Sequence, residues 1–208
     1  MNKWTFPTQI YAGPDSLNRL TVFSNESILI ICDPFLKDSP SLTYVMGLMD
    51  SKNKVTIYTD VVPDPPITHV VKGIEFMEGI KPTVIIAIGG GSCIDMSKGI
   101  AYFGRKLKQM DIKSFIAVPT TSGTGSEVTS FAVLTDSETQ IKYPLVDDAV
   151  LPDEALLTPL FVKTSPPSVT AFSGMDVLVH ALEAYVATAA NNFTDALAQQ
   201  AIELVFTY

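Results

Sequence analysis

The sequence has little charge and few cysteines or histidines for its length. Of its 208 residues, 17% are charged, two are cysteine and two are histidine, and the net charge is −8. A negative net charge argues against nucleic acid and against anionic membrane surfaces as partners. The two cysteines, Cys32 and Cys93, follow no pairing pattern and indicate reduced thiols in a cytoplasmic protein.

Long apolar runs and targeting segments are also missing. The amino terminus has no basic stretch followed by an apolar run, which predicts that there is no signal peptide, and no apolar run is long enough to span a bilayer. The apolar fraction is nevertheless 47%, which predicts a large core and a surface suited to a partner. At this length we expect one domain, or one domain plus a piece of another.

The chain is organised around a strand, a glycine turn and a helix. Residues 83–88 are an apolar, β-branched run, typical of a strand buried on both faces. The glycine loop, defined as Gly89–Ser92, follows at once, and the spacing of Ser92 and Asp95 predicts a capping box. Such a turn readily binds phosphate. Ile94 occupies the third glycine position of the dinucleotide fingerprint, so a tight turn without a ligand is the alternative for this stretch alone.

Up to Val118 the pattern alternates strands and helices. Beside the central unit we expect an edge strand within residues 1–15, around Trp4, Phe6 and Ile10, with further strands at 28–32, 54–59 and 114–118 and helices at 40–50 (capped by Ser39) and 67–79. This alternation predicts a Rossmann-like α/β fold, a parallel sheet with helices on both faces.

After Val118 the pattern changes. The hydroxyl loop, defined as Thr120–Ser126, precedes a predicted hairpin (131–135 and 140–145) and a short strand at 155–157. From Ser165 onward we expect only helices, one to about Ala187 and one capped by Thr194 and running to the end. The last helix ends without glycine, proline or a basic residue. We therefore expect an α/β domain over 1–165 and, over 166–208, the start of an incomplete, truncated all-α domain.

Three polar features fall at the carboxyl ends of predicted strands, where ligands bind in doubly wound sheets: Asp33, the glycine loop and the hydroxyl loop. An acidic residue there accepts both ribose hydroxyls of an adenosine and repels a 2′-phosphate, although capping the next turn explains Asp33 equally well. Asp33 precedes the glycine loop, so this is not a standard Rossmann half. The threonines of the hydroxyl loop favour a ligand shared between the two loops, although threonines also form turns.

Asp176 and His180 are spaced i, i+4 on a predicted helix, so both side chains project from one face. A carboxylate and an imidazole suit iron, zinc or manganese, while a surface hydrogen bond is the more common explanation of such a pair. The apolar neighbours predict that the pair is buried. A metal site needs at least three protein ligands, and the other histidine, His69, is better explained as a solvated helix residue. The chain supplies half a metal site.

Three motifs together resemble the iron-dependent (group III) alcohol dehydrogenase family, over essentially the whole chain: Gly89–Lys98, Pro119–Thr129 and Gly174–Tyr185. Within the family the resemblance is greatest to the enzymes of propanediol and ethanolamine utilisation, which convert propanal or acetaldehyde into the alcohol. It implies a nicotinamide-cofactor-binding domain followed by a helical metal-binding domain. It also implies a cytoplasmic enzyme, associated in some relatives with a bacterial microcompartment, that forms a homodimer when full-length.

The resemblance also assigns roles to residues. Asp33 matches the residue on the adenosine ribose, Asp176 and His180 match the first two metal ligands, and Lys142 lies near the nicotinamide ribose. The remaining expected cofactor-binding residues, along the phosphates and the nicotinamide side, are Gly90, Gly91, Ser92, Asp95, Thr120, Thr121 and Thr124. The expected cofactor is NAD, and the expected metal is Fe²⁺, with Zn²⁺ as the alternative. The family's other two ligands are histidines of the helical domain, which this sequence lacks.

The implied reaction is hydride transfer between NAD and a short-chain alcohol or aldehyde, with the metal as Lewis acid; no side chain is identified as a proton-transfer base. A glycerol-dehydrogenase-like polyol oxidoreductase is the nearest alternative among enzymes. The alternative from another class is a catalytically inactive nucleotide-binding fragment, or a chain that only associates with an intact paralogue. The missing histidines favour that alternative for this chain and predict that it is inactive on its own.

Overall fold

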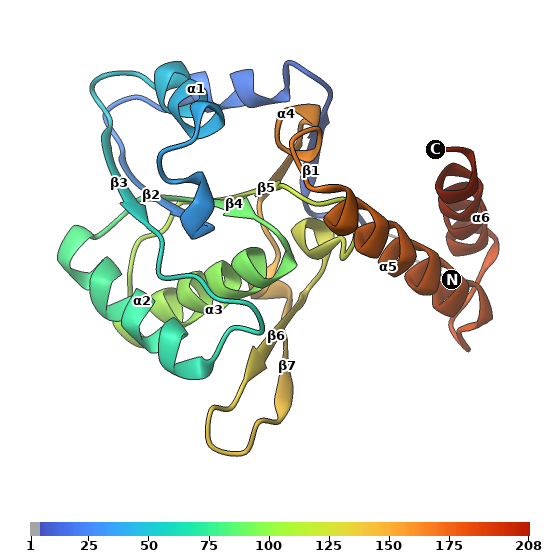
Figure 1. The fold of residues 1–208 in the computed structure, drawn as a ribbon. Helices are drawn as coiled ribbons and strands as arrows, with labels where there is room; N and C mark the ends of the chain where they lie inside the picture. The colour runs from blue at the N-terminus through green and yellow to red at the C-terminus, as the bar shows by residue number, and fades with distance from the viewer. Residues whose placement is uncertain (1–4) are drawn as a thin grey trace.

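The structure is a computed structural model that describes residues 5–208. In this range the main sheet has six strands, all parallel, in the order β1-β8-β5-β4-β2-β3 (Figure 1). Their bounds are β1 Gln9–Ala12, β2 Ser27–Cys32, β3 Lys54–Tyr58, β4 Val84–Gly89, β5 Ser114–Pro119 and β8 Glu154–Leu157. The predicted parallel α/β sheet is confirmed, and so is the edge strand near the amino terminus. Trp4, which the sequence places in that segment, lies outside the described residues.

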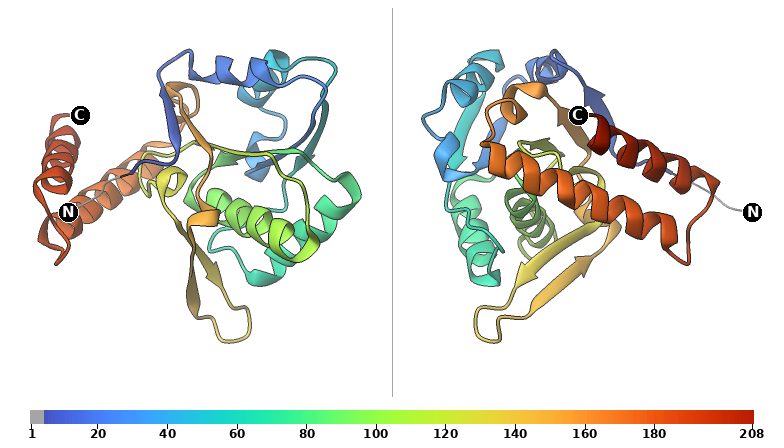
Figure 2. Two further views of the ribbon diagram at one scale, coloured as in Figure 1. Left: turned by 180° about the vertical axis from the view of Figure 1, so that it is seen from behind. Right: turned by 45° about the vertical axis from the view of Figure 1, so that its right-hand side comes forward.

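Helices cover both faces of this sheet, as predicted. The helices α2 and α3 lie on one face, and α1, α4 and the short helix η1 lie on the other (Figures 1 and 2). The predicted hairpin is the separate antiparallel pair β6–β7. The bounds of these elements are α1 Pro40–Leu48, α2 Ile67–Ile80, α3 Gly91–Lys108, α4 Pro159–Val162, η1 Ser16–Val22, η2 Pro34–Leu36, η3 Ser126–Val128, η4 Asp148–Val150, β6 Phe131–Thr135 and β7 Lys142–Val146.

Strand β4 is apolar throughout because it is buried on both faces. Ile85 and Ala87 pack into the cluster formed with α2 and α3, whereas Ile86 and Ile88 pack into the cluster formed with α1. Side chains alternate between the faces of a strand, so two covered faces require an unbroken apolar run. Each isoleucine buried in this way contributes about 1.5–3 kcal/mol.

Two of the three predicted helix caps are wrong, and both errors have a local cause. Ser39 caps α1 as predicted, since its Oγ accepts the Leu42 N–H at 3.1 Å. Helix α3 instead starts at Gly91, directly after the strand, with Gly90 as N-cap and no side-chain capping bond, so Ser92 and Asp95 form no capping box. The last helix, α6 (Asn192–Thr207), is capped by Asn191 rather than by Thr194.

At the start of α6 the capping bonds run in both directions. The Asn191 side chain accepts the Thr194 N–H, while the Thr194 hydroxyl accepts the Asn191 N–H at 2.9 Å. Thr194 is therefore the third helical residue of a reciprocal capping box, which places the helix start three residues before the predicted one.

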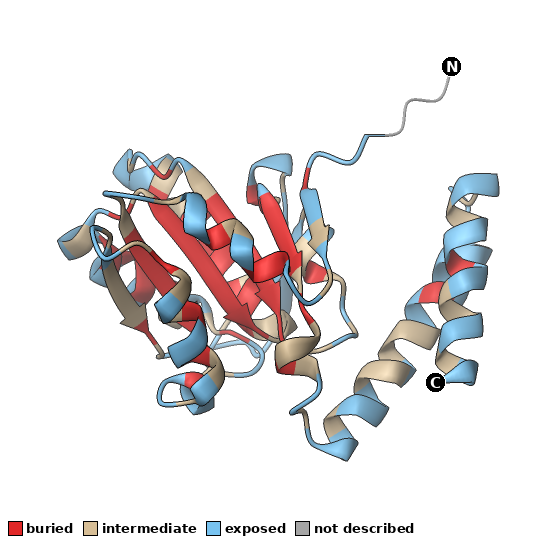
Figure 3. Ribbon diagram, turned by 90° about the horizontal axis from the view of Figure 1, so that it is seen from above, coloured by how far each residue is buried: buried red, intermediate tan, exposed pale blue. Residues whose placement is uncertain are grey.

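The two C-terminal helices form an arm that projects from the α/β body. Helix α5 (Pro167–Val186) leads away from the body, and α6 turns back and packs against α5 (Figures 1 and 2). Within these two helices, which are described throughout, only Ala181 and Ala198 are buried, whereas the central strands β2, β4 and β5 of the body are buried almost completely (Figure 3). Several large apolar side chains of the arm are exposed, including Leu182, Tyr185, Leu197, Leu204 and Phe206. Leu178 is half-buried. Among residues 5–208, no helix has both the length and the apolar character needed to cross a membrane.

Candidate dinucleotide and metal site

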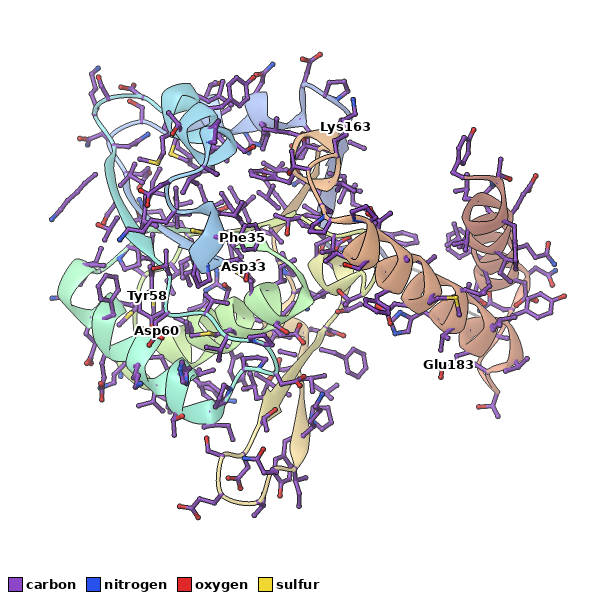
Figure 4. The ribbon with its side chains drawn as sticks, viewed as in Figure 1. Asp33, Phe35, Tyr58, Asp60, Lys163 and Glu183 are labelled. Atoms are coloured by element: carbon purple, nitrogen blue, oxygen red, sulfur yellow. The ribbon has the colours of Figure 1, made fainter. Side chains whose placement is uncertain are left out.

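The sheet reverses its direction of growth between β2 and β4, and two of the predicted features follow these strands. From β2 the chain continues to β3 on one side, and from β4 it continues to β5 on the other. Cys32, at the end of β2, pairs with Ile88 of β4, so Asp33 and the glycine loop leave the sheet together. Figure 4 shows Asp33 at the end of β2, beside the start of α3. Ligands of doubly wound sheets bind in the crevice at such a switch point.

Asp33 holds the glycine loop in place. Its Oδ2 accepts the Gly90 N–H at 3.1 Å, and a Cβ at position 89 would lie 2.6 Å from the same oxygen. Burial raises the pKa of the Asp33 carboxyl, and the Gly90 N–H opposes this rise by stabilising the charged form. The carboxylate thus binds the start of α3 rather than capping η2, and it lies half-buried at the crevice.

The glycine loop and the hydroxyl loop touch each other. A Cβ at Gly91 would lie 2.8 Å from Thr124 Oγ1, so only glycine allows this approach. Thr124 is exposed and Thr121 half-buried, whereas Thr120 is buried and its N–H donates to Gly89 O at 3.0 Å. The hydroxyl loop therefore packs beside the first turn of α3, whose N–H groups have no acceptor within the helix.

Asp95 and Lys142 lie at the same crevice, but both contact other protein groups. Asp95 Oδ1 accepts the Ser126 hydroxyl at 2.6 Å, and its Oδ2 accepts the Val133 N–H at 2.9 Å. Lys142 is exposed, with Nζ 2.6 Å from Asp64 Oδ1. The Asp64 N–H donates to Ser92 Oγ at 3.3 Å, which draws the loop before α2 across the glycine loop. Sequence reasoning missed Asp64, although its loop follows the carboxyl end of β3.

Asp176 and His180 face the same crevice from α5. Their Oδ1 and Nδ1 atoms are 3.7 Å apart, and a Cβ at Gly123 of the hydroxyl loop would lie 3.1 Å from Asp176 Oδ2. Their side chains are 39% and 52% exposed, so the prediction of a buried pair is wrong. The apolar neighbours that suggested burial lie on the arm, where little covers them.

A third ligand for a metal is missing from the described residues. No group of three or more His, Cys, Asp or Glu side chains within residues 5–208 is arranged to hold a metal ion. His69 is not the solvated residue that the sequence suggested, because its side chain is only 22% exposed and its Nε2 lies 3.7 Å from Asp60 Oδ1. The pair on α5 therefore fits part of a metal site but does not complete one.

One cleft of about 650 Å³ brings six of the predicted residues together: Ser92, Asp95, Thr124, Lys142, Asp176 and His180. Asp64, Ser126 and Thr129 also line it. Asp33, Gly90, Gly91, Thr120 and Thr121 are not part of its lining; the first three lie at the adjoining switch point. The cleft therefore joins the start of α3 to the pair on α5.

The sequence profile of the iron-containing alcohol dehydrogenase family matches residues 7–159, and that of the Fe-containing alcohol dehydrogenase family, C-terminal, matches residues 170–208. The chain belongs to the iron-containing alcohol dehydrogenase family. The resemblance drawn from the three motifs is thus confirmed.

Relatives within this family include enzymes named for short-chain alcohols. The chain is 47% identical over 208 residues to 1-propanol dehydrogenase PduQ of Citrobacter freundii, covering 100% of this chain and 56% of that protein. It is 40% identical over 221 residues to the NADPH-dependent butanol dehydrogenase of Clostridium saccharobutylicum, covering 99% of this chain and 57% of that protein. The chain therefore spans little more than half the length of these relatives.

Solved structures of the family have the same fold. Sulfoacetaldehyde reductase from Bifidobacterium kashiwanohense, in complex with NAD⁺, matches with a TM-score of 0.91 at 29% identity, over 100% of this chain and 59% of that one. A 1,3-propanediol oxidoreductase matches with a TM-score of 0.85 at 30% identity, over 99% of this chain and 58% of that one.

Proposed function

We propose that this chain is the NAD(H)-binding part of a metal-dependent alcohol dehydrogenase that interconverts short-chain aldehydes, such as propanal and acetaldehyde, and their primary alcohols. The observation that carries the proposal is the single cleft that joins Ser92, Thr124 and Lys142 to Asp176 and His180. The likeness to a propanol and a butanol dehydrogenase supports the substrate class.

In this proposal the pyrophosphate of NAD binds at the glycine loop. Gly91 and Ser92 open an 18-residue helix, whose N-terminus carries a partial charge of about +0.5 and free N–H groups. Asp33 accepts the adenosine ribose hydroxyls, and Thr121 and Thr124 donate to the phosphates. Lys142 binds beside the nicotinamide ribose, which requires its ammonium to leave Asp64.

Asp176 and His180 would hold the metal, Fe²⁺ or Zn²⁺, from one face of α5. A bound divalent ion would supply Lewis-acid polarisation of the substrate oxygen. Two ligands hold such an ion loosely, and further ligands would have to come from outside residues 5–208. We therefore propose that this 208-residue chain binds the dinucleotide but does not turn over alcohol by itself.

The domain division at residues 165 and 166 is part of the same proposal, with the body binding the dinucleotide and the arm contributing to metal binding. The homodimer, the cytoplasmic location and the microcompartment association that the resemblance implies remain predictions.

The direct test is a fluorescence titration of the chain with NADH and with NADPH. We expect NADH to bind more tightly by roughly 1–3 kcal/mol, because the Asp33 carboxylate would face a 2′-phosphate. One relative is named NADPH-dependent, so the ratio of the two affinities is the most informative quantity to measure. Equal affinities would contradict the role of Asp33, and failure to bind either dinucleotide would overturn the proposed function.

The second test is propanal-dependent oxidation of NADH by the chain reconstituted with Fe²⁺ or Zn²⁺, beside a His180→Ala variant. We expect no turnover from either protein. Robust turnover that disappears in His180→Ala would show that two protein ligands suffice.

A further inference from the structure

Lys98 is the largest fully buried side chain among the described residues, and the proposed reaction gives it no role. It lies on α3, two turns after the glycine loop, with a side chain 0% exposed. Its Nζ donates to Thr129 O at 2.9 Å, to Thr129 Oγ1 at 3.1 Å and to Phe131 O at 2.6 Å. These contacts use all three donors of the ammonium group.

Asp95, one turn earlier on α3, binds the same segment of chain. Its two oxygens accept from Ser126 Oγ and from the Val133 N–H, and its Oδ1 lies 3.9 Å from Lys98 Nζ. Together the two side chains hold residues 126, 129, 131 and 133, which lead from the hydroxyl loop into β6. We call this arrangement the α3 clamp.

The α3 clamp sets the position of the hydroxyl loop, which touches both halves of the cleft. Thr124 packs on Gly91 at the start of α3, and Gly123 packs against Asp176 on α5. The glycine loop opens α3, and the clamp lies further along the same helix. The spacing of the two loops is therefore fixed by one rigid element, partly through Lys98, which does not line the cleft.

Stability does not explain a lysine at this position. A buried ion pair is commonly no more stable than well-packed apolar side chains of similar volume, because both charges must leave water. Burial lowers the pKa of Lys98 to about 8, and Asp95 and Glu127 oppose the lowering without cancelling it. An apolar residue would avoid this cost but would leave the two carbonyl groups without their donor.

We propose that Lys98 is a positioning residue for the dinucleotide cleft, in which its buried ammonium fixes the segment after the hydroxyl loop to α3 and so sets the gap between the two loops. This inference rests on the proposed dinucleotide binding. Lys98 is absent from the lining of the cleft, so its effect on binding passes through Thr129 and Phe131, which it contacts and which line the cleft.

The test compares Lys98→Met with Lys108→Met in the 208-residue chain. Lys108 makes the matched control, because it lies on the same helix but pairs with Glu78 at the surface. Two quantities are measured in each variant: hydrogen exchange of the amides of residues 126–133, and the affinity for NADH by fluorescence. Lys98→Gln, which keeps N–H donors on a shorter side chain, replaces Lys98→Met if that variant does not fold.

We expect Lys98→Met to accelerate exchange in residues 126–133 and to weaken NADH binding by about tenfold each, the effect of losing one hydrogen bond to a charged group. Lys108→Met should change neither quantity. A third variant, Met77→Ala in the buried core of α2, should lower stability without changing the affinity. An affinity that falls as much in Met77→Ala as in Lys98→Met would show a merely structural role and overturn the proposal.

Unchanged exchange in Lys98→Met overturns the α3 clamp, and faster exchange with unchanged NADH affinity overturns the positioning role. If the unmodified chain does not bind NADH, the proposed function fails and the positioning of a dinucleotide fails with it. In that case the exchange data still decide whether Lys98 holds the segment.

Discussion

The body and the arm of this protein have similar apolar side chains and very different burial. Phe115 in β5 is 1% exposed, whereas Phe172 in α5 is 75% exposed. A strand of the body has a layer of helices on each side, while each helix of the arm packs mainly on the other (Figure 3). The number of layers around an element therefore decides how far its side chains are buried. The residue type decides only how much free energy that burial contributes.

The two regions also differ in what they contribute to the candidate site. The body supplies the first turn of α3 and, at the adjoining switch point, Asp33, which suit a dinucleotide, and the arm supplies Asp176 and His180, which suit a metal. The hydroxyl loop lies between them and touches both. Changes in one region should therefore affect one half of the site, and changes in the loop should affect both.

The largest difference in stability between the two regions should appear when a leucine in each is replaced by alanine. Leu29→Ala in β2, where the side chain is 1% exposed, should lower the free energy of unfolding by about 2–5 kcal/mol. Leu182→Ala in α5, where it is 48% exposed, should lower it by less than about 1 kcal/mol. Urea denaturation followed by circular dichroism measures both, and equal losses would mean that the arm is packed as tightly as the body.

A second test uses the buried charge of Lys98. A pKa shift by burial requires the close packing that the body has and the arm lacks. Burial lowers the pKa of Lys98 from 10.5 to about 8 against the opposing charges of Asp95 and Glu127, so between these values the unfolded chain binds more protons than the folded one. The free energy of unfolding, relative to Lys98→Met, should therefore rise by about 1–3 kcal/mol as the pH increases from 8 to 10.5.

Below pH 8, Lys98 is protonated in both states, and the difference between the two proteins should be flat. Urea denaturation at several pH values measures this difference, and a flat or falling difference above pH 8 would contradict the lowered pKa of Lys98.

A third, smaller effect should separate the two halves of the candidate site. Asp33→Asn keeps an oxygen to accept the Gly90 N–H but removes the charge, so the preference for NADH over NADPH should shrink by about tenfold, or about 1.4 kcal/mol. His180→Ala on the arm should leave both affinities within about twofold, because a metal ligand does not touch the adenosine end. A large loss of NADH affinity in His180→Ala would show that the arm also binds the dinucleotide.

The smallest effect on stability, and the clearest on association, should come from the exposed face of the arm. The chain should self-associate or bind a hydrophobic dye, because large apolar patches favour contact with other apolar surfaces. Replacing Leu182 and Leu197 together by Gln should reduce both effects and change the free energy of unfolding by less than about 0.5 kcal/mol, since both side chains are already exposed. Light scattering and dye fluorescence measure the two effects. A monodisperse monomer that binds no dye would contradict this expectation.

The sequence alone determined the elements and the edge of the sheet at which the site forms. Apolar runs and helical spacing are local properties, so they predicted the buried strand β4, the cap at Ser39 and the parallel sheet. Because parallel strands end at a common edge, position along the chain was enough to bring Asp33 and the two loops together.

Only the tertiary structure decided what the polar side chains contact, because those contacts join residues far apart in the sequence. Spacing suggested that Asp95 belongs with Ser92, whereas its carboxylate binds Ser126 and Val133 instead. Lys98 appeared in the sequence only as one letter of a motif, since nothing local shows that a lysine is buried against carbonyl groups 31 and 33 residues away. The exposure of Asp176 and His180 likewise depends on what packs against α5, which the apolar residues beside them do not specify.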